Sequence, residues 1–202
     1  MPEQSVAGEV TQIAEILEGQ IVAPSRPQAD TLAVKRLLGH ELEHRLGTTT
    51  GRVGWSIFSD PQLRLGQNVL IPDLAGWRKA RLPRPPLDNR FHTVPDWLCE
   101  VLSPITAVLD RTRKLNVYAN LGVCWVWLVD PRHRTLEVLW LEGDEWVLAG
   151  AFGGDDRVRV SPFDGIEIDL TALWRAGAVG QEMDLDNAAL VAGGDGRKGA
   201  TP

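Results

Sequence analysis

The pattern of apolar and polar residues over 95–131 predicts a buried strand, a helix and a second buried strand. Residues 97–102 alternate, which places Glu100 and two leucines on the same face of the first strand. The Ser-Pro pair that follows ends this strand, because proline has no backbone N–H to donate. A helix is expected over 105–121, closed by a glycine. The unbroken apolar run at 124–129 is typical of a central strand buried on both faces.

Glu100 needs a cationic partner in such an environment, because an unpaired carboxylate among apolar side chains is costly. The helix offers one, since Asp110, Lys114 and Tyr118 follow each other at intervals of four residues and form a single stripe. Glu100 at the end of the strand and Lys114 on the next helix could therefore face one site.

The remaining pattern predicts one further helix and several antiparallel hairpins. Together with the central unit, these elements indicate a single α/β domain over 11–175, between a polar lead-in (1–10) and a mostly disordered tail (176–202). The other predicted elements are a hairpin turn at Glu18-Gly19, a helix capped by Asp30 or Thr31 and ending near Leu46, strands at 52–59 and 67–72, an extended segment at 74–78, a hairpin at 136–149, edge strands at 157–160 and 165–170, and a helical turn at 173–174.

Composition narrows the class of protein. The chain has 202 residues, of which 44% are hydrophobic, and no apolar run approaches the length of about 20 residues that a membrane span needs. The first residues do not have the pattern of a secretory signal. The two cysteines, Cys99 and Cys124, fall in predicted buried strands and indicate core thiols of a reducing compartment, so a cytoplasmic location is expected. A net charge of −6 argues against a general nucleic-acid coat but leaves room for a local basic groove.

Asp73, at the end of the apolar segment 67–72, is the second acid of a candidate metal site. Two carboxylates at the ends of neighbouring strands, Asp73 and Glu100, can hold a hard divalent cation such as Mg²⁺. A metal beside a phosphate stabilises developing charge, and a nearby lysine such as Lys114 can orient the attacking water. The alternative from the residues alone is that Asp73 caps a strand and that Lys114 pairs with Asp110 on a solvated surface.

A series of motifs occurs in a fixed order along the chain. They are Ile71-Pro72-Asp73-Leu74, Pro95-Asp96-Trp97-Leu98-Cys99-Glu100-Val101-Leu102-Ser103-Pro104, Asp110-Arg111-Thr112-Arg113-Lys114-Leu115, Tyr118-Ala119, Gly122-Val123 and Trp127-Leu128-Val129-Asp130-Pro131. Together they resemble the Uma-two family of restriction-endonuclease-like proteins, which have the PD-(D/E)xK nuclease fold. The resemblance extends from about Ile13 to Trp174.

The resemblance implies a restriction-endonuclease-like fold, with a mixed central sheet flanked by helices and additional antiparallel hairpins. It implies a metal-dependent endonuclease acting on DNA, with Mg²⁺ or Mn²⁺ held by Asp73, Glu100 and the carbonyl of Val101. Lys114 would orient the attacking water. In related nucleases, active sites are commonly paired to cut two DNA strands, which would imply a homodimer. Apart from the resemblance, Glu41, Ser103, Asp110 and Tyr118 are candidates for supporting roles.

The chain departs from the family pattern at two places. In the parent nuclease pattern the lysine follows the acid by two residues on the same strand, where this chain has Leu102. The resemblance assigns the role to Lys114 on the following helix instead, the residue that the stripe also indicates. Relatives often have a histidine near the start of the first helix, and residues 29–31 contain none, which puts any supporting role of that histidine in doubt.

A different chemistry is suggested by His40-Glu41-Leu42-Glu43-His44, which matches the H-E-x-x-H motif of zinc peptidases. Thr50 stands where longer versions of that motif have a third histidine. Both histidines also fall away from the apolar stripe of the predicted helix. Glu41 lies nearer the stripe, where it could approach the metal site or remain at a solvated edge.

Three more interpretations concern binding rather than catalysis. The basic, proline-rich loop over 78–92 could guide a phosphate backbone or could be a solvated loop. Trp77 beside it could stack on a base or pack at a rim. The whole fold could also serve as a non-catalytic module that binds nucleic acid or protein, which the acidic net charge makes plausible.

Overall fold

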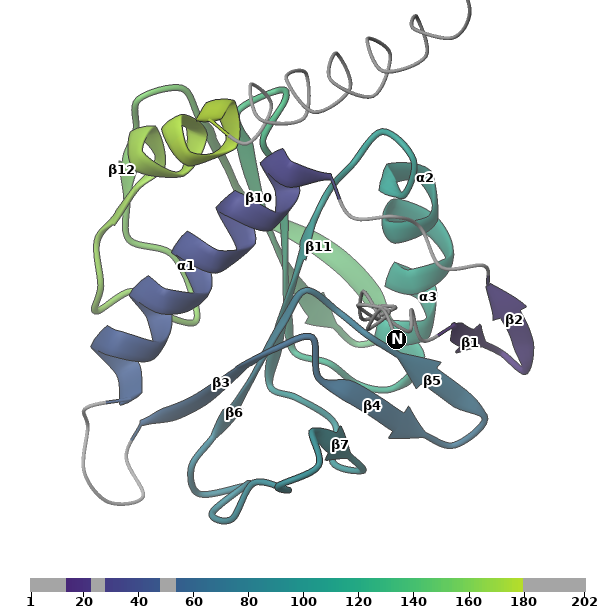
Figure 1. Ribbon diagram of the computed structural model, residues 1–202. Helices are drawn as coiled ribbons and strands as arrows, with labels where there is room; N and C mark the ends of the chain where they lie inside the picture. Colours follow the sequence, from purple (N-terminus) through teal and green to yellow (C-terminus); the bar gives the residue numbers. More distant parts are fainter. Residues whose placement is uncertain (1–13, 23–27, 48–53, 180–202) are drawn as a thin grey trace, which may run out of the picture.

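The computed structural model describes residues 14–22, 28–47 and 54–179, and its main element is a six-stranded mixed sheet (Figure 1). Only the central pair, β8 and β9, runs parallel, and all other neighbours are antiparallel. In order across the sheet, the strands are β11 (Glu145–Gly153), β10 (Thr135–Glu142), β9 (Trp125–Asp130), β8 (Trp97–Val101), β6 (Leu74–Arg78) and β3 (Trp55–Ser59).

A second, smaller mixed sheet lies beside the first. Its order is β2 (Gln20–Val22), β1 (Glu15–Leu17), β5 (Asn68–Leu70), β4 (Gln62–Leu65) and β7 (Arg90–Phe91), while β12 (Arg157–Val158) pairs with β13 (Ile168–Asp169) in a separate ladder. The predicted hairpin turn at Glu18-Gly19 is confirmed, and both residues have positive φ angles (53° and 78°) as a tight two-residue turn requires.

Helices cover both faces of the main sheet (Figure 1). Val34, Leu38 and Leu42 pack with one set of sheet residues, and Val117 and Tyr118 pack with the set on the opposite face. The helical segments are α1 (Ala29–Gly47), α2 (Ala107–Leu109), the π-helical turn η1 (Asp110–Lys114), α3 (Leu115–Asn120) and a helix over 170–179. No helix in the described ranges is long and apolar enough to cross a membrane.

Strand β8 is buried along its whole length. Trp97, Cys99 and Val101 belong to the core under α1, and Leu98 belongs to the core under α3. Alternation therefore directs Glu100 toward α3, as the sequence predicts. The parallel neighbour β9 supplies the second buried strand of the predicted unit.

Three predictions of local structure need correction. Asp73 does not end a strand of 67–72; it lies in the link between β5 in the small sheet and β6 in the main sheet, because the chain changes sheets at the proline before it. The segment between the predicted strands 52–59 and 67–72, where no strand is predicted, contains strand β4, whose two leucines are buried. Cys124 is exposed rather than buried, because β9 begins one residue later.

The helix ends also differ from the predicted ones. Helix α1 begins at Ala29, before either predicted capping residue, since the carbonyl of Gln28 accepts hydrogen bonds from the N–H of Leu32 and the hydroxyl of Thr31. The helix over 170–179 extends four residues beyond the predicted domain end. The rest of the predicted tail and the lead-in lie outside the described residues.

Candidate active site

Asp73 and Glu100 lie at the same edge of the main sheet. Strands β6 and β8 are antiparallel, so the start of β6 adjoins the end of β8. Asp73 directly precedes β6, and its Oδ2 accepts a hydrogen bond of 2.7 Å from the backbone N–H of Val101, the neighbour of Glu100. The backbone of the central strand therefore fixes one acid beside the other.

A lysine from α1 pairs with Asp73. The ammonium of Lys35 lies 3.4 Å from Asp73 Oδ1 and 2.7 Å from Asp60 Oδ1. Asp60 is in the turn after β3, and its backbone N–H donates to the carbonyl of Asp73. We call Lys35, Asp60 and Asp73 the Lys35 cluster.

A second lysine pairs with Glu100. The ammonium of Lys114 lies 2.8 Å from Glu100 Oε1, 3.3 Å from Glu15 and 3.4 Å from Asp110, and the hydroxyl of Tyr118 donates to the same Glu100 oxygen. We call these five residues the Lys114 cluster. An ammonium has three protons to donate, so three carboxylates match its capacity.

The sequence left open that Lys114 pairs with Asp110 on a solvated surface, and the solvated location is wrong. The pair is present, but both side chains are 5% exposed and the lysine also contacts Glu100. Asp110 and Lys114 are the two ends of the π-helical turn η1, a conformation that often marks functional sites.

Burial dominates the pKa values of both acids. The pKa of Glu100 is raised to about 8, chiefly because burial disfavours its charge; Lys114 opposes the shift and Asp110 and Asp73 add to it. The pKa of Asp73 is also raised by burial, against the charge of Lys35 and the N–H of Val101.

Lys114 keeps its proton at neutral pH. Burial alone would lower its pKa, but the surrounding charges, above all that of Glu100, raise the pKa well above the ordinary lysine value. The side chain is therefore a cation that can orient or attract groups, and it is unsuited to accept a proton.

The acids fit a hard divalent cation that keeps part of its water. Glu100 Oε1 accepts a hydrogen bond from the hydroxyl of Tyr118 and forms the ion pair with Lys114. The N–H and the C=O of one strand residue point toward the same neighbouring strand. Because the N–H of Val101 donates to Asp73, the carbonyl of Val101 also points toward Asp73. Among the described residues no three His, Cys, Asp or Glu side chains gather as metal ligands, so water would complete the shell, as is usual for Mg²⁺.

Charge in the two clusters also favours a cation. Five carboxylates (Glu15, Asp60, Asp73, Glu100 and Asp110) surround two ammonium groups. An excess of buried negative charge is stabilised by a bound cation or by protons, and the raised pKa values of Glu100, Asp73 and Asp110 reflect that excess together with burial.

Two residues assigned supporting roles do not contact the acids. Ser103 shares hydrogen bonds with Thr106 at the start of the helical segment, where it fixes the turn that leads into α2. Glu41 forms a 2.6 Å salt bridge with Arg45 on the exposed side of α1.

The zinc-peptidase interpretation finds no support in the described chain. His40 and His44 are exposed and their ring centroids lie 6.1 Å apart. No third ligand accompanies them among the described residues, and Thr50 lies outside those residues.

The interpretation of Trp77 as a base-stacking residue is wrong, because its ring is fully buried and stacks on Phe91. The basic loop near it is partly neutralised: Arg81 pairs with Asp96 at 2.6 Å and Arg90 lies near Asp88. This leaves a smaller free positive charge than the sequence suggests.

Three residues of the clusters were missed by sequence reasoning. Lys35 left a signal, since it precedes Leu38 and Leu42 by three and seven residues and so falls on the apolar stripe of the helix. Asp60 and Glu15 left none, because each joins its cluster through contacts that only the folded chain creates.

A mixed sheet flanked by helices, with two acids and a lysine at one edge, defines the restriction-endonuclease-like class of nuclease folds. A family model, Uma2, described as "Putative restriction endonuclease", matches residues 9–171, and the chain belongs to this family. The crystal structure of a "putative nuclease belonging to DUF820" from Anabaena variabilis superposes with a TM-score of 0.69 at 23% identity, over 84% of this chain and 94% of that one, which shows the shared fold. A search of curated proteins found no match.

Proposed function

We propose that this chain is a metal-dependent endonuclease that hydrolyses phosphodiester bonds of DNA. The observation that best supports the proposal is the convergence of three groups from separate elements. The ammonium of Lys114 lies 2.8 Å from Glu100, and the next residue of that strand, Val101, donates its N–H to Asp73. Two acids and an amine at one sheet edge are what a metal-assisted phosphoryl transfer needs.

Asp73, Glu100 and the carbonyl of Val101 would hold Mg²⁺ or Mn²⁺. When bound, such an ion stabilises charge that develops on the scissile phosphate and lowers the pKa of a coordinated water. The protein's part is to present these oxygens in fixed positions. The N–H of Val101 fixes Asp73, while Tyr118 and Lys114 fix Glu100.

Lys114 would orient the attacking water and attract the phosphate. Its raised pKa keeps it protonated, so it acts through charge and hydrogen bonds. Asp110 and Glu15 hold its ammonium from two sides, and Tyr118 holds the carboxylate that it contacts. These three residues are positioning residues.

The proposal is tested first by metal binding. Calorimetric titration with Mg²⁺ and Mn²⁺ should show binding to the wild type that is lost in Asp73→Ala and in Glu100→Ala. Asp88→Ala, which removes an exposed acid in the basic loop, is the matched control and should bind as the wild type does. Circular dichroism on each variant separates lost binding from lost folding. Binding that survives both acid substitutions would refute the metal site.

Cleavage is tested next with supercoiled plasmid DNA. The wild type should convert the plasmid to nicked or linear forms only when metal is present. Lys114→Ala should retain metal binding within a few-fold and lose cleavage by at least about 100-fold, in the range of a lost transition-state contact. Equal cleavage by both proteins would exclude Lys114 from the reaction.

A non-catalytic binding module is the second candidate, and one observation favours it. Three carboxylates lie within 3.4 Å of the Lys114 ammonium, as in a purely structural ion network. This alternative predicts DNA or protein binding without metal-dependent cleavage. Gel-shift measurements with and without Mg²⁺ on the wild type and on Lys114→Ala distinguish it from the nuclease.

The proposal extends to a homodimer if both DNA strands are cut together. Two sites in one dimer should yield linear plasmid early in the reaction, whereas a monomer should accumulate nicked circles. Sedimentation equilibrium on the same preparation gives the oligomeric state independently.

A further inference from the structure

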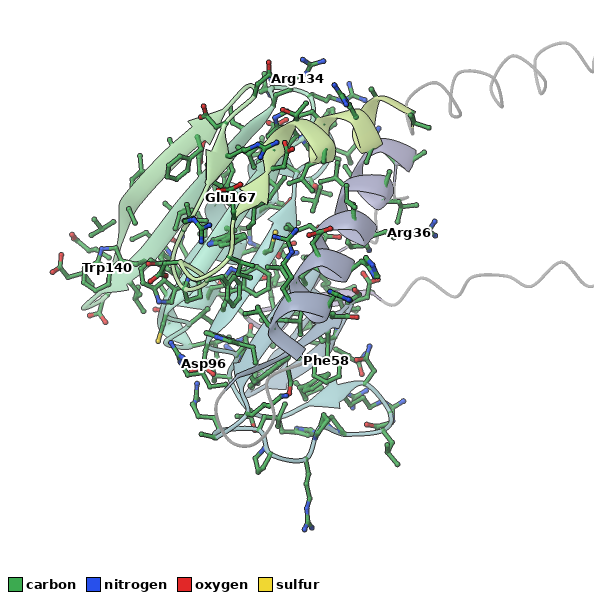
Figure 2. All side chains as sticks on the ribbon, turned by 90° about the vertical axis from the view of Figure 1, so that its left-hand side faces the viewer. Arg36, Phe58, Asp96, Arg134, Trp140 and Glu167 are labelled. Carbon is green, nitrogen blue, oxygen red and sulfur yellow. The ribbon has the colours of Figure 1, made fainter. Side chains whose placement is uncertain are left out.

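Lys35 is a buried cation on the inner side of α1. The residue is 8% exposed, although its neighbour Arg36 points away from the sheet into solvent (Figure 2). Its ammonium reaches the sheet edge and contacts two acids there, Asp60 and Asp73. A side chain so enclosed is poorly placed to contact a DNA backbone, so its role has to be sought among the groups it touches.

The position of this ammonium conflicts with a metal ion on Asp73. The ammonium lies 3.4 Å from Asp73 Oδ1, the oxygen left free when Oδ2 accepts the N–H of Val101. A magnesium ion bound to Oδ1 would lie about 2.1 Å from it, so the two cations would be within about 5.5 Å of each other. At that distance, in a partly buried site, their repulsion is substantial.

Asp60 provides a second place for the ammonium. Its carboxylate forms the shorter contact with Lys35, at 2.7 Å, and its side chain is 55% exposed. Its backbone N–H donates to the carbonyl of Asp73, so the two acids keep a fixed spacing. Lys35 can therefore remain bound to Asp60 while Asp73 accepts another cation.

We propose that Lys35 is a positioning residue that holds Asp73 in the absence of metal and competes with a divalent cation for Oδ1 of Asp73. Asp60 weakens this competition, because it binds the ammonium of Lys35 when a metal ion occupies Asp73. The inference rests on the proposed metal site at Asp73 and Glu100. It makes Lys35 a determinant of how tightly the site binds its ion, and it assigns opposite effects to the loss of Lys35 and the loss of Asp60.

The test is a calorimetric titration of metal-free proteins with Mg²⁺ and with Mn²⁺ at pH 8. Lys35→Met keeps most of the buried aliphatic chain and removes the charge. The variant should bind metal about tenfold more tightly than the wild type, which is about 1.4 kcal/mol of binding free energy. Asp60→Asn leaves the ammonium to Asp73 alone and should bind metal several-fold more weakly. Arg36→Met removes one positive charge from the adjacent, outward position and should change nothing. Asp73→Ala should abolish binding.

Opposite shifts in Lys35→Met and Asp60→Asn support the proposal. Unchanged or weaker binding by a folded Lys35→Met protein overturns it, and so do shifts of the two variants in the same direction. If Lys35→Met does not fold, Asp60→Asn decides alone, because it keeps the size of a side chain that is 55% exposed. Unchanged or tighter metal binding by Asp60→Asn then overturns the proposal. A wild type that binds no metal contradicts the proposed function. If Lys35→Met then gains metal binding, the result still supports competition by Lys35. If neither protein binds metal, the inference about Lys35 is refuted as well.

Discussion

The Lys35 cluster and the Lys114 cluster each pair a lysine with a candidate metal-binding acid, but water reaches them differently. In the first, the side chain of Lys35 is 10% exposed, but those of its partners Asp60 and Asp73 are 55% and 26% exposed. In the second, those of Glu100, Lys114 and Asp110 are 4–5% exposed, and that of Glu15 is 18% exposed. The Lys35 cluster is therefore the open end of the site, with one short ion pair between Lys35 and Asp60. The Lys114 cluster is the enclosed end, where one lysine contacts three carboxylates.

In the proposed metal site, this difference would separate two tasks. The carboxylates of Asp60 and Asp73 at the open end can be rehydrated when a partner leaves, so ions can exchange there at lower cost. Charges in the enclosed end cannot be rehydrated, so each depends on every other one. We infer that the open end governs access of the metal and that the enclosed end fixes the geometry of the reacting groups.

The largest expected effect is on stability at the enclosed end. Lys114→Met leaves three carboxylates without their shared cation and should lower the free energy of unfolding by about 3–5 kcal/mol. Lys35→Met should change it by about 1 kcal/mol or less, since its partners are more exposed. Urea denaturation of the metal-free proteins measures both values. Equal losses in the two variants would contradict the contrast between the clusters.

The next effect is a pH dependence of metal binding. Glu100 has a pKa of about 8 in the metal-free protein, and its proton must leave before the carboxylate can bind a cation. Affinity for Mg²⁺ should therefore rise by roughly tenfold per pH unit between pH 6 and pH 8. Calorimetry at three pH values tests this, and a flat profile would place the ion away from Glu100.

The raised pKa of Glu100 also determines how the stability of the protein changes with pH. A carboxyl that is harder to ionise in the folded state contributes stability below its ordinary pKa of 4.5 and loses it as the pH rises toward 8. The urea midpoint of the metal-free protein should fall over this range relative to that of Glu100→Gln. Parallel curves for the two proteins would mean that Glu100 does not titrate there.

A smaller effect is expected from the hydroxyl of Tyr118. Tyr118→Phe removes one of the two donors to Glu100 Oε1 while keeping the ring in the core. The loss should be about 1–2 kcal/mol of stability, with metal affinity reduced a few-fold. Chemical denaturation and calorimetry measure the two quantities. A stability unchanged from wild type would mean that water replaces the hydroxyl and that the cluster is less enclosed than its exposure indicates.

The smallest effect concerns Glu41. Glu41→Gln breaks an exposed pair with Arg45 and should cost at most about 0.5 kcal/mol, with no change in metal affinity. Thermal melts and calorimetry suffice as the check. A clear loss of metal affinity would restore the supporting role that the sequence assigned to this residue.

Much of the fold around the site could be predicted from the sequence because its signals are local. The alternation that places Glu100 on one face, the helical spacing of Asp110 and Lys114, and the positive-φ glycine that ends the helix are all properties of short segments. The structure confirms the arrangement of these segments, and the distance of 2.8 Å between Glu100 and Lys114 agrees with the expected pairing. Their catalytic and metal-binding roles stay predictions.

The rest of the site depends on contacts between distant parts of the chain. Lys35 and Asp60 are 25 residues apart in sequence, and no local rule brings a helix residue to a turn after a strand. The position of Asp73 was misjudged because the chain changes sheets there, which alternation cannot reveal. The π-helical turn also has no separate signal, since residues four apart neighbour each other in either kind of helix.

The contacts of Glu15 have a consequence for how the folded protein forms during synthesis. One of its oxygens accepts the N–H of Ile71, 56 residues further along the chain, and also contacts Lys114. During synthesis the hairpin that contains Glu15 leaves the ribosome long before either partner exists. The enclosed end of the site can therefore close only after the chain has been made through Lys114, so a nascent chain that already contains Asp73 and Glu100 still has an incomplete site.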